Sequence, residues 1–142
     1  MTTQLDHILN KDNFSKRPIE PKISFEKIEK EIGYELPDEY KYYLANFDYF
    51  EDFLGPEYVK LFAYDSLLEE NQKYGVIEAL PNTIMIGNNG SSEFIAIELA
   101  DTNKYRIILS PFIDLSAEYH IEIGSSFSDM LIRLDNGTGW FR

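Results

Sequence analysis

Residues 84–99, IMIGNNGSSEFIAIEL, contain the pattern that decides the fold of this chain. The runs 84–86 and 94–99 are rich in the apolar and β-branched residues that favour strands. Between them, Asn88-Asn89-Gly90 supplies residue types that tolerate a positive φ, as the tight turns of hairpins require. The stretch therefore predicts a β-hairpin, and with it an antiparallel sheet at the centre of the molecule.

On the C-terminal side, the chain is predicted to extend this sheet and to end in a helix. A turn at 101–104 leads into a strand at 105–109. Further on, Ser126 can cap a helix that Asn136-Gly137 ends. The apolar side chains of this helix recur at helical spacing and share one face: Phe127, Met130, Leu131 and Leu134.

A second strand is predicted at 119–123, where apolar and polar residues alternate strictly. Tyr119, Ile121 and Ile123 would face the core, and His120 and Glu122 would face solvent. In that arrangement His120 is a surface residue paired with Glu118 or Glu122, and it has no partner at metal-ligand spacing.

On the N-terminal side, two helices precede the sheet. The first runs from a cap at Ser24 to a stop at Gly33, with Phe25, Ile28 and Ile32 at helical spacing. The second begins near Pro37, a residue that suits a first helical turn. Its predicted core face consists of Tyr40, Tyr43, Leu44 and Phe47.

The stretch between the second helix and the central hairpin is predicted to hold a strand at 58–64 and a short helix at 66–74. Together these elements indicate an α+β fold, a mainly antiparallel sheet with helices packed against one face. We expect a single domain over 24–142, long enough to bury one core. Residues 1–23 are expected to be an irregular segment that can hold a short helix, with a connector around Pro18 and Pro21.

Composition limits the classes of function. The net charge of −12 disfavours nucleic-acid binding, because phosphate neutralisation requires clustered Lys and Arg, and it favours a basic protein partner. The chain has no cysteine, no signal-like start and no run long enough to span a membrane, so we expect a cytoplasmic protein that does not bind membranes.

No catalytic constellation stands out. The only histidines are His7 and His120, and acidic pairs such as Glu51-Asp52 and Glu69-Glu70 are typical of solvated surface charge. Gly87-Asn88-Asn89-Gly90 lacks the lysine of a phosphate-binding loop, so a hairpin turn explains it more simply. We therefore predict no enzyme activity, no metal site and no cofactor.

The order of these motifs resembles the SUKH superfamily of cell-wall-assembly-regulator-like proteins. The residues that carry the resemblance are Phe25-Glu26, Ile32-Gly33, Leu36-Pro37, Tyr40, Tyr43-Leu44, Asn46-Phe47, Ile84-Met85-Ile86-Gly87, Asn89-Gly90, Glu93-Phe94-Ile95-Ala96-Ile97, Ser126-Phe127 and Leu131. The sequence departs from the family pattern at 46–53, where a short glycine-bearing turn often stands.

The resemblance implies an α+β fold and a non-catalytic role. For bacterial members it implies an immunity protein that neutralises a cognate toxin domain by direct binding, and such toxins are often nucleases. The alternative is a regulatory scaffold or adaptor that recruits proteins without inhibiting them, as eukaryotic relatives suggest.

Residues 35–70 are the predicted partner-binding region, because ten acids against two bases give them a net charge of −8 and they are rich in aromatic residues. Tyrosine suits an interface because its rigid ring offers contact area at little entropic cost, and acids steer a basic partner. The alternative is that the rings fill the core and the acids only keep the protein soluble. The candidate contacts are Asp38, Glu39, Tyr42, Asp48, Tyr49, Glu51 and Asp52.

Overall fold

The structure is a computed structural model that describes residues 3–17 and 23–141. The predicted connector around Pro18 and Pro21 therefore lies largely outside the described residues. Within them, the helices are α1 (Thr3–Lys11), α2 (Glu26–Ile32), α3 (Asp38–Asn46), α4 (Tyr64–Tyr74), α5 (Val76–Ala79) and α6 (Phe127–Asp135), with a short 3-10 helix, η1 (Ala117–Tyr119). The strands are β1 (Phe50–Leu54), β2 (Glu57–Leu61), β3 (Thr83–Asn88), β4 (Glu93–Asp101), β5 (Lys104–Pro111) and β6 (Ile121–Gly124).

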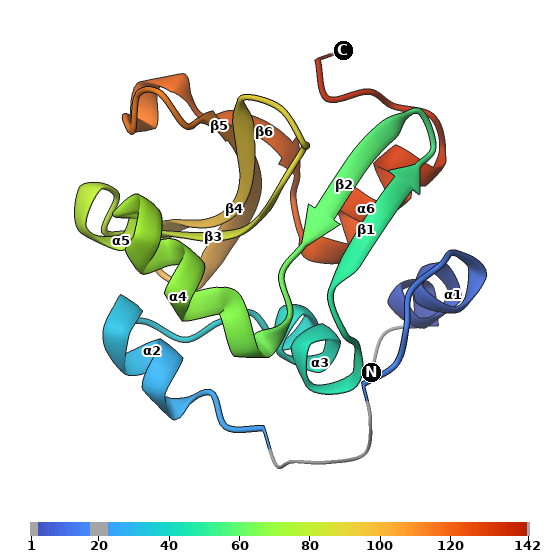
Figure 1. The fold of residues 1–142 in the computed structure, drawn as a ribbon, viewed down its shortest axis with the longest axis horizontal. Coiled ribbons are helices and arrows are strands. Elements are labelled where there is room, and N and C mark those ends of the chain that lie inside the picture. Colours follow the sequence, from blue (N-terminus) through green and yellow to red (C-terminus); the bar gives the residue numbers. More distant parts are fainter. Residues whose placement is uncertain (1–2, 18–22, 142) are drawn as a thin grey trace.

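The strands of the described residues form one antiparallel sheet in the order β1-β2-β3-β4-β5-β6. Each strand therefore pairs with its neighbour in the sequence, and the connection from β2 to β3 contains α4 and α5. Figure 1 shows that β3 to β6 curl strongly, whereas the β1–β2 hairpin projects from the curled part. The predicted α+β class, a mainly antiparallel sheet with packed helices, is confirmed.

The central hairpin is the one that the sequence predicted. β3 and β4 pair with Ile84 opposite Ile97, and the turn between them contains Gly90 at φ 74. Gly87 has a different role, because a Cβ there would collide with the carbonyl of Lys60 on β2. The glycine thus permits the close approach of β2 to β3.

The predicted core faces of α3 and α6 are also confirmed. Tyr40, Tyr43 and Leu44 of α3 are fully buried. α3 packs on α6 through the ring of Phe127, whose centroid lies 5.4 Å from that of Tyr40 and 5.0 Å from that of Tyr43. The side chain of Ser126 caps α6, because its hydroxyl accepts a hydrogen bond from the Asp129 N–H at 3.1 Å.

The region between α3 and β3 differs from the prediction. β1 occupies 50–54, where the sequence reading assigned no strand, and the strand expected at 58–64 is β2 at 57–61. The reason is the turn at Gly55-Pro56, where Gly55 has φ 56 and reverses the chain into a second hairpin. α4 consequently begins at Tyr64, two residues before the predicted start.

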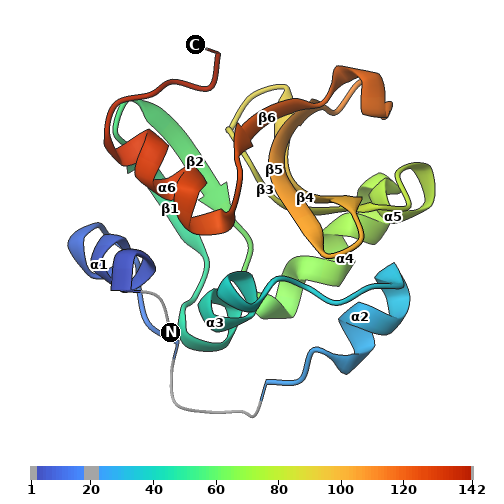
Figure 2. The ribbon, with the colours of Figure 1, turned by 180° about the vertical axis from the view of Figure 1, so that it is seen from behind.

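The β1–β2 hairpin has one covered face and one uncovered face. Phe50, Leu54, Val59 and Leu61 point into the core. Helix α6 lies behind the hairpin in Figure 1 and in front of it in Figure 2, so it covers the inner face. No helix of the described residues crosses the outer face, which is turned to the viewer in Figure 1.

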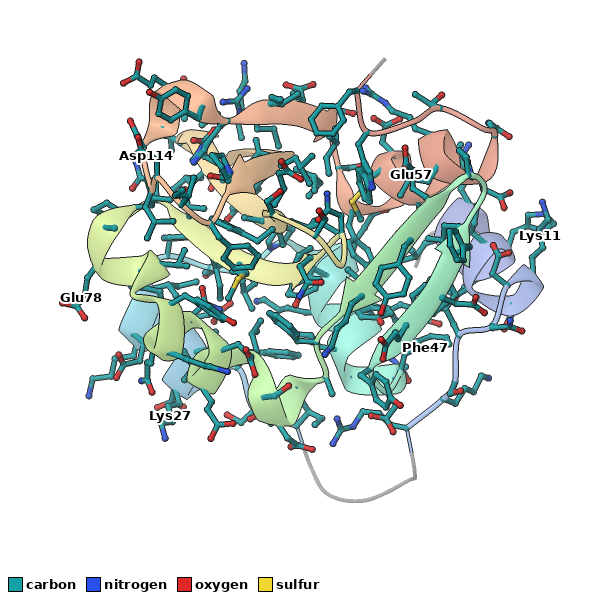
Figure 3. The ribbon with its side chains drawn as sticks, turned by 45° about the horizontal axis from the view of Figure 1, so that its top comes forward. Lys11, Lys27, Phe47, Glu57, Glu78 and Asp114 are labelled. Carbon is teal, nitrogen blue, oxygen red and sulfur yellow. The ribbon has the colours of Figure 1, made fainter. Side chains whose placement is uncertain are left out.

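The N-terminal and C-terminal segments pack on the same side as α6. Leu5, Ile8 and Leu9 of α1 are buried in the common core. Lys11 of α1 forms an ion pair with Asp135 of α6 at 2.7 Å. At the turn end of the β1–β2 hairpin, Glu57 accepts a hydrogen bond from the Trp140 N–H at 3.0 Å, and Figure 3 shows it beside the C-terminal segment.

The predicted strand at 119–123 is wrong in its first half. The chain forms η1 at 117–119, and β6 begins only at Ile121. The strict alternation is therefore interrupted before the sheet begins, which turns Tyr119 and Ile121 outward and buries His120. Of the predicted orientations in this strand, only the inward placement of Ile123 and the exposure of Glu122 are confirmed.

Candidate protein-binding surface

The alternation of β1 and β2 builds an outer face from side chains that the core does not use. Glu51 lies opposite Lys60, and Phe53 lies opposite Tyr58. Because residues two apart along a strand share a face, these four side chains point to the same side. Tyr49, two residues before Glu51, extends this set, and we call the five residues the hairpin face.

Two aromatic rings of the hairpin face are exposed well beyond what a core residue would be. Phe53 is 61% exposed and Tyr49 is 56% exposed. Phe53 packs edge-to-face on Tyr58, with ring centroids 5.9 Å apart. Large exposed rings gathered on one surface are typical of protein-interaction sites.

Tyr58 is held in place from two directions. Its hydroxyl donates a hydrogen bond to Glu51, and this bond raises the pKa of Tyr58 to about 12. From the other side, Gly90 of the central turn lies against the ring so closely that a Cβ would collide with it. The aromatic part of the hairpin face is therefore pre-ordered, which reduces the entropy lost on binding.

A hollow of about 380 Å³ adjoins the hairpin face where α4 begins. Its walls include Phe62 and Ser66, and its charged groups are Glu51, Lys60 and Glu70. Two carboxylates against one amine leave the hollow acidic, and Asp65 and Glu69 of α4 are exposed nearby in the sequence. The surface thus combines exposed rings with negative charge, a combination suited to a basic protein partner.

The structure gives the predicted contact residues different surroundings. Tyr49 and Glu51 lie together on the hairpin face. Asp38 is exposed at the first turn of α3, at the end of that helix remote from β1. Asp48 is half-buried, and its carboxylate accepts a hydrogen bond from the Tyr49 N–H at 2.8 Å, which fixes the chain just before the hairpin.

The remaining three predicted residues make contacts within the protein. Glu39 accepts hydrogen bonds from the N–H and the hydroxyl of Ser128, at 3.1 and 2.7 Å. Tyr42 donates to Asp6 at 2.6 Å, and this bond, aided by burial, raises the pKa of Tyr42.

Asp52 likewise accepts a hydrogen bond from the Asn13 amide at 2.6 Å, which together with the Phe53 N–H lowers the pKa of Asp52. These contacts tie α6 and α1 to α3, and the segment after α1 to β1.

Phe53, Tyr58, Lys60 and Glu70 were not among the predicted contacts. The signal for the first three was present in the sequence as alternation on both sides of Gly55-Pro56, once 50–54 and 57–61 are taken as one hairpin. Glu70 reaches the surface from α4, a contact between elements that no local pattern encodes.

His120 was predicted to be a solvent-facing residue paired with Glu118 or Glu122, and this is wrong. Its side chain is 0% exposed, and Nδ1 lies 2.7 Å from a carboxylate oxygen of Glu98. The other oxygen of Glu98 accepts from Nε of Arg106 at 2.5 Å. His120 Nε2 is buried with no partner among the described residues. We call Glu98, Arg106 and His120 the charged triad.

No feature of the described residues indicates a metal centre, since residues 3–17 and 23–141 contain no group of three or more His, Asp or Glu side chains placed to hold an ion. Nor is any helix in this part of the chain long and apolar enough to cross a membrane.

The fold is of the α+β class, an antiparallel sheet with packed helices. The family model of the SMI1 / KNR4 family (SUKH-1) matches residues 22–133, and the chain belongs to this family. The predicted SUKH resemblance is thereby confirmed. A search of the curated proteins finds no match. The family is in general associated with toxin immunity, with protein partners and with non-catalytic action.

Proposed function

We propose that this protein is a non-catalytic immunity protein of the bacterial cytoplasm that binds and neutralises a cognate toxin domain of basic character. The observation that carries the proposal is the hairpin face, where the exposed rings of Tyr49 and Phe53 flank the carboxylate of Glu51. In a family associated with immunity, such a surface supports capture of a protein rather than turnover of a substrate.

The net charge of −12 gives the proposal its electrostatic basis. A toxin that acts on nucleic acid needs a positive surface for the phosphate backbone. An acidic inhibitor is attracted to that surface and occupies it, so steering and inhibition use the same charges. The candidate contacts are the residues of the hairpin face together with Glu70. Asp38 and Asp48 lie outside this group.

The direct test takes a toxin domain found by sequencing the neighbouring genes, mixes it with the purified protein, and measures binding and toxin activity. An equimolar complex in which the toxin is inactive, together with rescue of cells that express the toxin, is the expected result. A complex in which the toxin keeps full activity would instead support the scaffold or adaptor role. Absence of any complex at low salt would contradict both.

A further inference from the structure

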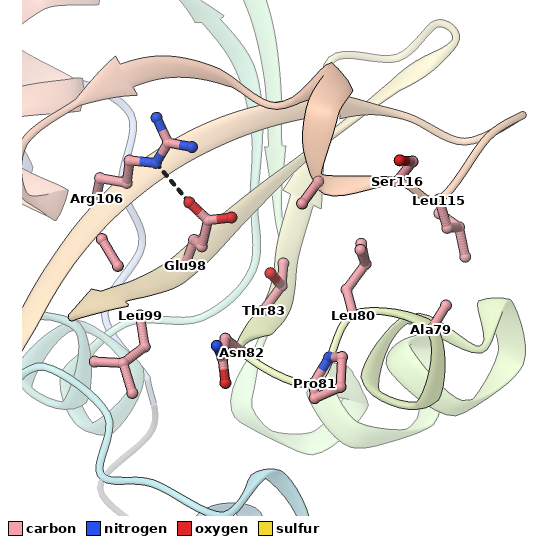
Figure 4. A pocket seen from close by; sticks show the side chains of 12 residues that line it. Ala79, Leu80, Pro81, Asn82, Thr83, Glu98, Leu99, Arg106, Leu115 and Ser116 are labelled. Atoms are coloured by element: carbon pink, nitrogen blue, oxygen red, sulfur yellow. Dashed lines mark hydrogen bonds and ion pairs between the residues drawn. The ribbon is translucent and has the colours of Figure 1, made fainter. Parts of the chain in front are cut away.

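A second pocket lies away from the hairpin face, on the side of the sheet that carries the charged triad. It has a volume of about 670 Å³ and is formed by the end of α5, the start of β3, the paired ends of β4 and β5, and the segment 115–117. Figure 4 shows Arg106 and Glu98 on one side, with Leu80 and Leu115 across from them. The size corresponds to a site for a small molecule or a short stretch of peptide.

The charged triad fixes the orientation of Arg106. Each oxygen of Glu98 already has a partner, Nε of Arg106 at 2.5 Å and Nδ1 of His120 at 2.7 Å. The terminal nitrogens of Arg106 are less engaged, because the hydrogen bond that its side chain makes within the described residues uses Nε, and the Glu122 carboxylate oxygen is 3.9 Å from Nη1, beyond hydrogen-bonding distance. Arg106 therefore presents N–H donors to the pocket in a fixed direction.

The surrounding charges determine which ligand groups can accept hydrogen bonds from these donors. Glu98 neutralises Arg106, and Glu122 and Glu118 add negative charge near the mouth, the latter through the hydroxyl of Ser116. An anionic group would be repelled by these carboxylates, and a cationic group would have to lie beside Arg106. A neutral acceptor, such as an amide carbonyl, avoids both of these charge repulsions.

Leucines form the apolar part of the pocket, beside the polar side chains of Asn82, Thr83 and Ser116. Leu80, Leu99 and Leu115 supply this part, and in the segment around 115–117, Ile113 is 92% exposed and Tyr119 is 46% exposed. Such walls accommodate an apolar side chain, and the exposed residues provide surface for a chain that continues beyond the pocket.

We infer that this pocket binds an uncharged apolar segment of a peptide chain, with a main-chain carbonyl on the terminal N–H groups of Arg106 and an apolar side chain against Leu80, Leu99 and Leu115. The inference goes beyond the proposed function, because it concerns another surface and an uncharged partner segment, whereas the proposed toxin partner is basic. It holds or fails independently of toxin binding.

The test uses three probes that share a leucine side chain and carry different charges: N-acetyl-leucine N′-methylamide is neutral, N-acetyl-leucine has a free carboxylate, and leucinamide has a free amine. They are titrated into the full-length 15N-labelled protein, and amide chemical shifts are recorded by NMR. We expect the neutral probe to shift the amide resonances of Leu80, Leu99 and Ala117 until the site is saturated. The two charged probes should bind at least about tenfold more weakly.

A longer neutral peptide, acetyl-Ala-Leu-Ala-amide, identifies the source of the ligand. Tighter binding than the single-residue amide supports a peptide segment. Equal or weaker binding overturns the peptide assignment in favour of a small amide molecule.

Two variants test the geometry. Arg106→Lys removes the paired terminal N–H donors and should weaken binding of the neutral probe. The fold of this variant is checked first, because Arg106 pairs with the half-buried carboxylate of Glu98. Ala117→Trp fills the pocket from an exposed position and leaves the charged triad intact, so it should abolish the shifts. Arg133→Met, remote from the pocket, is the control. Unchanged binding by Ala117→Trp, or equal binding of all three probes, would overturn the inference.

Discussion

The side chain of Asn71 in α4 takes the place of a neighbouring strand at Met85 of β3. Its Oδ1 accepts the Met85 N–H at 2.8 Å, and its Nδ2 donates to the Met85 carbonyl at 2.8 Å. β2 pairs with β3 only at Asn88 and Gly87 and then leads away through Phe62. Asn71 therefore satisfies backbone groups of a buried strand that the diverging sheet leaves without a partner.

Asn71→Ala should lower the free energy of unfolding by about 2–5 kcal/mol, because each buried backbone group left without a partner costs about 1–3 kcal/mol. Chemical denaturation measures the loss. Gln72→Ala, an exposed neighbour on the same helix, should change stability by less than about 0.5 kcal/mol. Losses of similar size for the two variants would show that α4 does not complete the sheet in this way.

Glu39 is expected to contribute to the stability of the fold. Its carboxylate accepts two hydrogen bonds from Ser128 at the start of α6, 89 residues away in the sequence. Glu39→Ala should therefore lower the free energy of unfolding by about 1–3 kcal/mol, since it removes a cap and leaves buried donors unpaired. Asp38→Ala, its exposed neighbour, should cost about 0.5 kcal/mol, and a larger loss at Asp38 than at Glu39 would reverse the assignment.

The charged triad should make stability depend on acid pH. Burial raises the pKa of Glu98, but hydrogen bonds from Arg106 and His120 outweigh it and hold the pKa below its ordinary value of 4.5. A carboxyl whose pKa is depressed in the folded state contributes its full stability above the unfolded pKa, and the contribution is lost as pH falls through the folded pKa.

Glu98→Gln should accordingly be less stable than the unmodified protein at pH 7, and the difference should shrink as pH falls below about 4.5. Urea denaturation of both proteins at pH 7, 5 and 3 gives the comparison. A difference that stays constant over this range would mean that the carboxylate contributes no charge-dependent stability.

The hydrogen bond between Tyr58 and Glu51 can be followed directly. It raises the pKa of Tyr58 from 10.0 to about 12, so its contribution to stability is present below pH 10 and is lost as pH rises through about 12. Glu51→Gln should bring the pKa of Tyr58 down toward 10. Absorbance titration of the phenolate, with Tyr58→Phe to assign the signal, measures the shift, and an unchanged titration would contradict this geometry.

The sequence predicted most reliably what local periodicity controls. The inward set Tyr40, Tyr43 and Leu44 follows from helical spacing alone, and the β3–β4 hairpin follows from Asn88-Asn89-Gly90 between two β-prone runs. β1 was not predicted because Glu51 and Asp52 make 50–54 resemble a loop until its pairing with 57–61 is known.

His120 and Asn71 show what local pattern cannot supply. Burial of His120 depends on a 3-10 turn that ends the alternation and on a carboxylate from β4. The partner of Asn71 is a backbone segment of β3, which carries no side-chain signature. Of the candidate site, the acidic aromatic region was predicted, whereas its division between internal contacts and the hairpin face required the fold.

The final prediction separates the acidic charges beside the hairpin face from its rings. Because exposed charges act mainly by steering the encounter, Glu69→Lys with Glu70→Lys, which leaves the Glu51–Tyr58 hydrogen bond intact, should slow association with the basic toxin domain and flatten its salt dependence, with little change in dissociation.

Phe53→Ala should instead speed dissociation, since a well-packed interface ring is worth about 2 kcal/mol or more, or roughly thirtyfold in affinity. Surface plasmon resonance at two salt concentrations measures both rates. The matched control is Glu31→Lys with Glu78→Lys, the same change in net charge on exposed positions of α2 and α5. If that control slows association as much as Glu69→Lys with Glu70→Lys does, and Phe53→Ala dissociates at the unmodified rate, the toxin binds elsewhere on the protein.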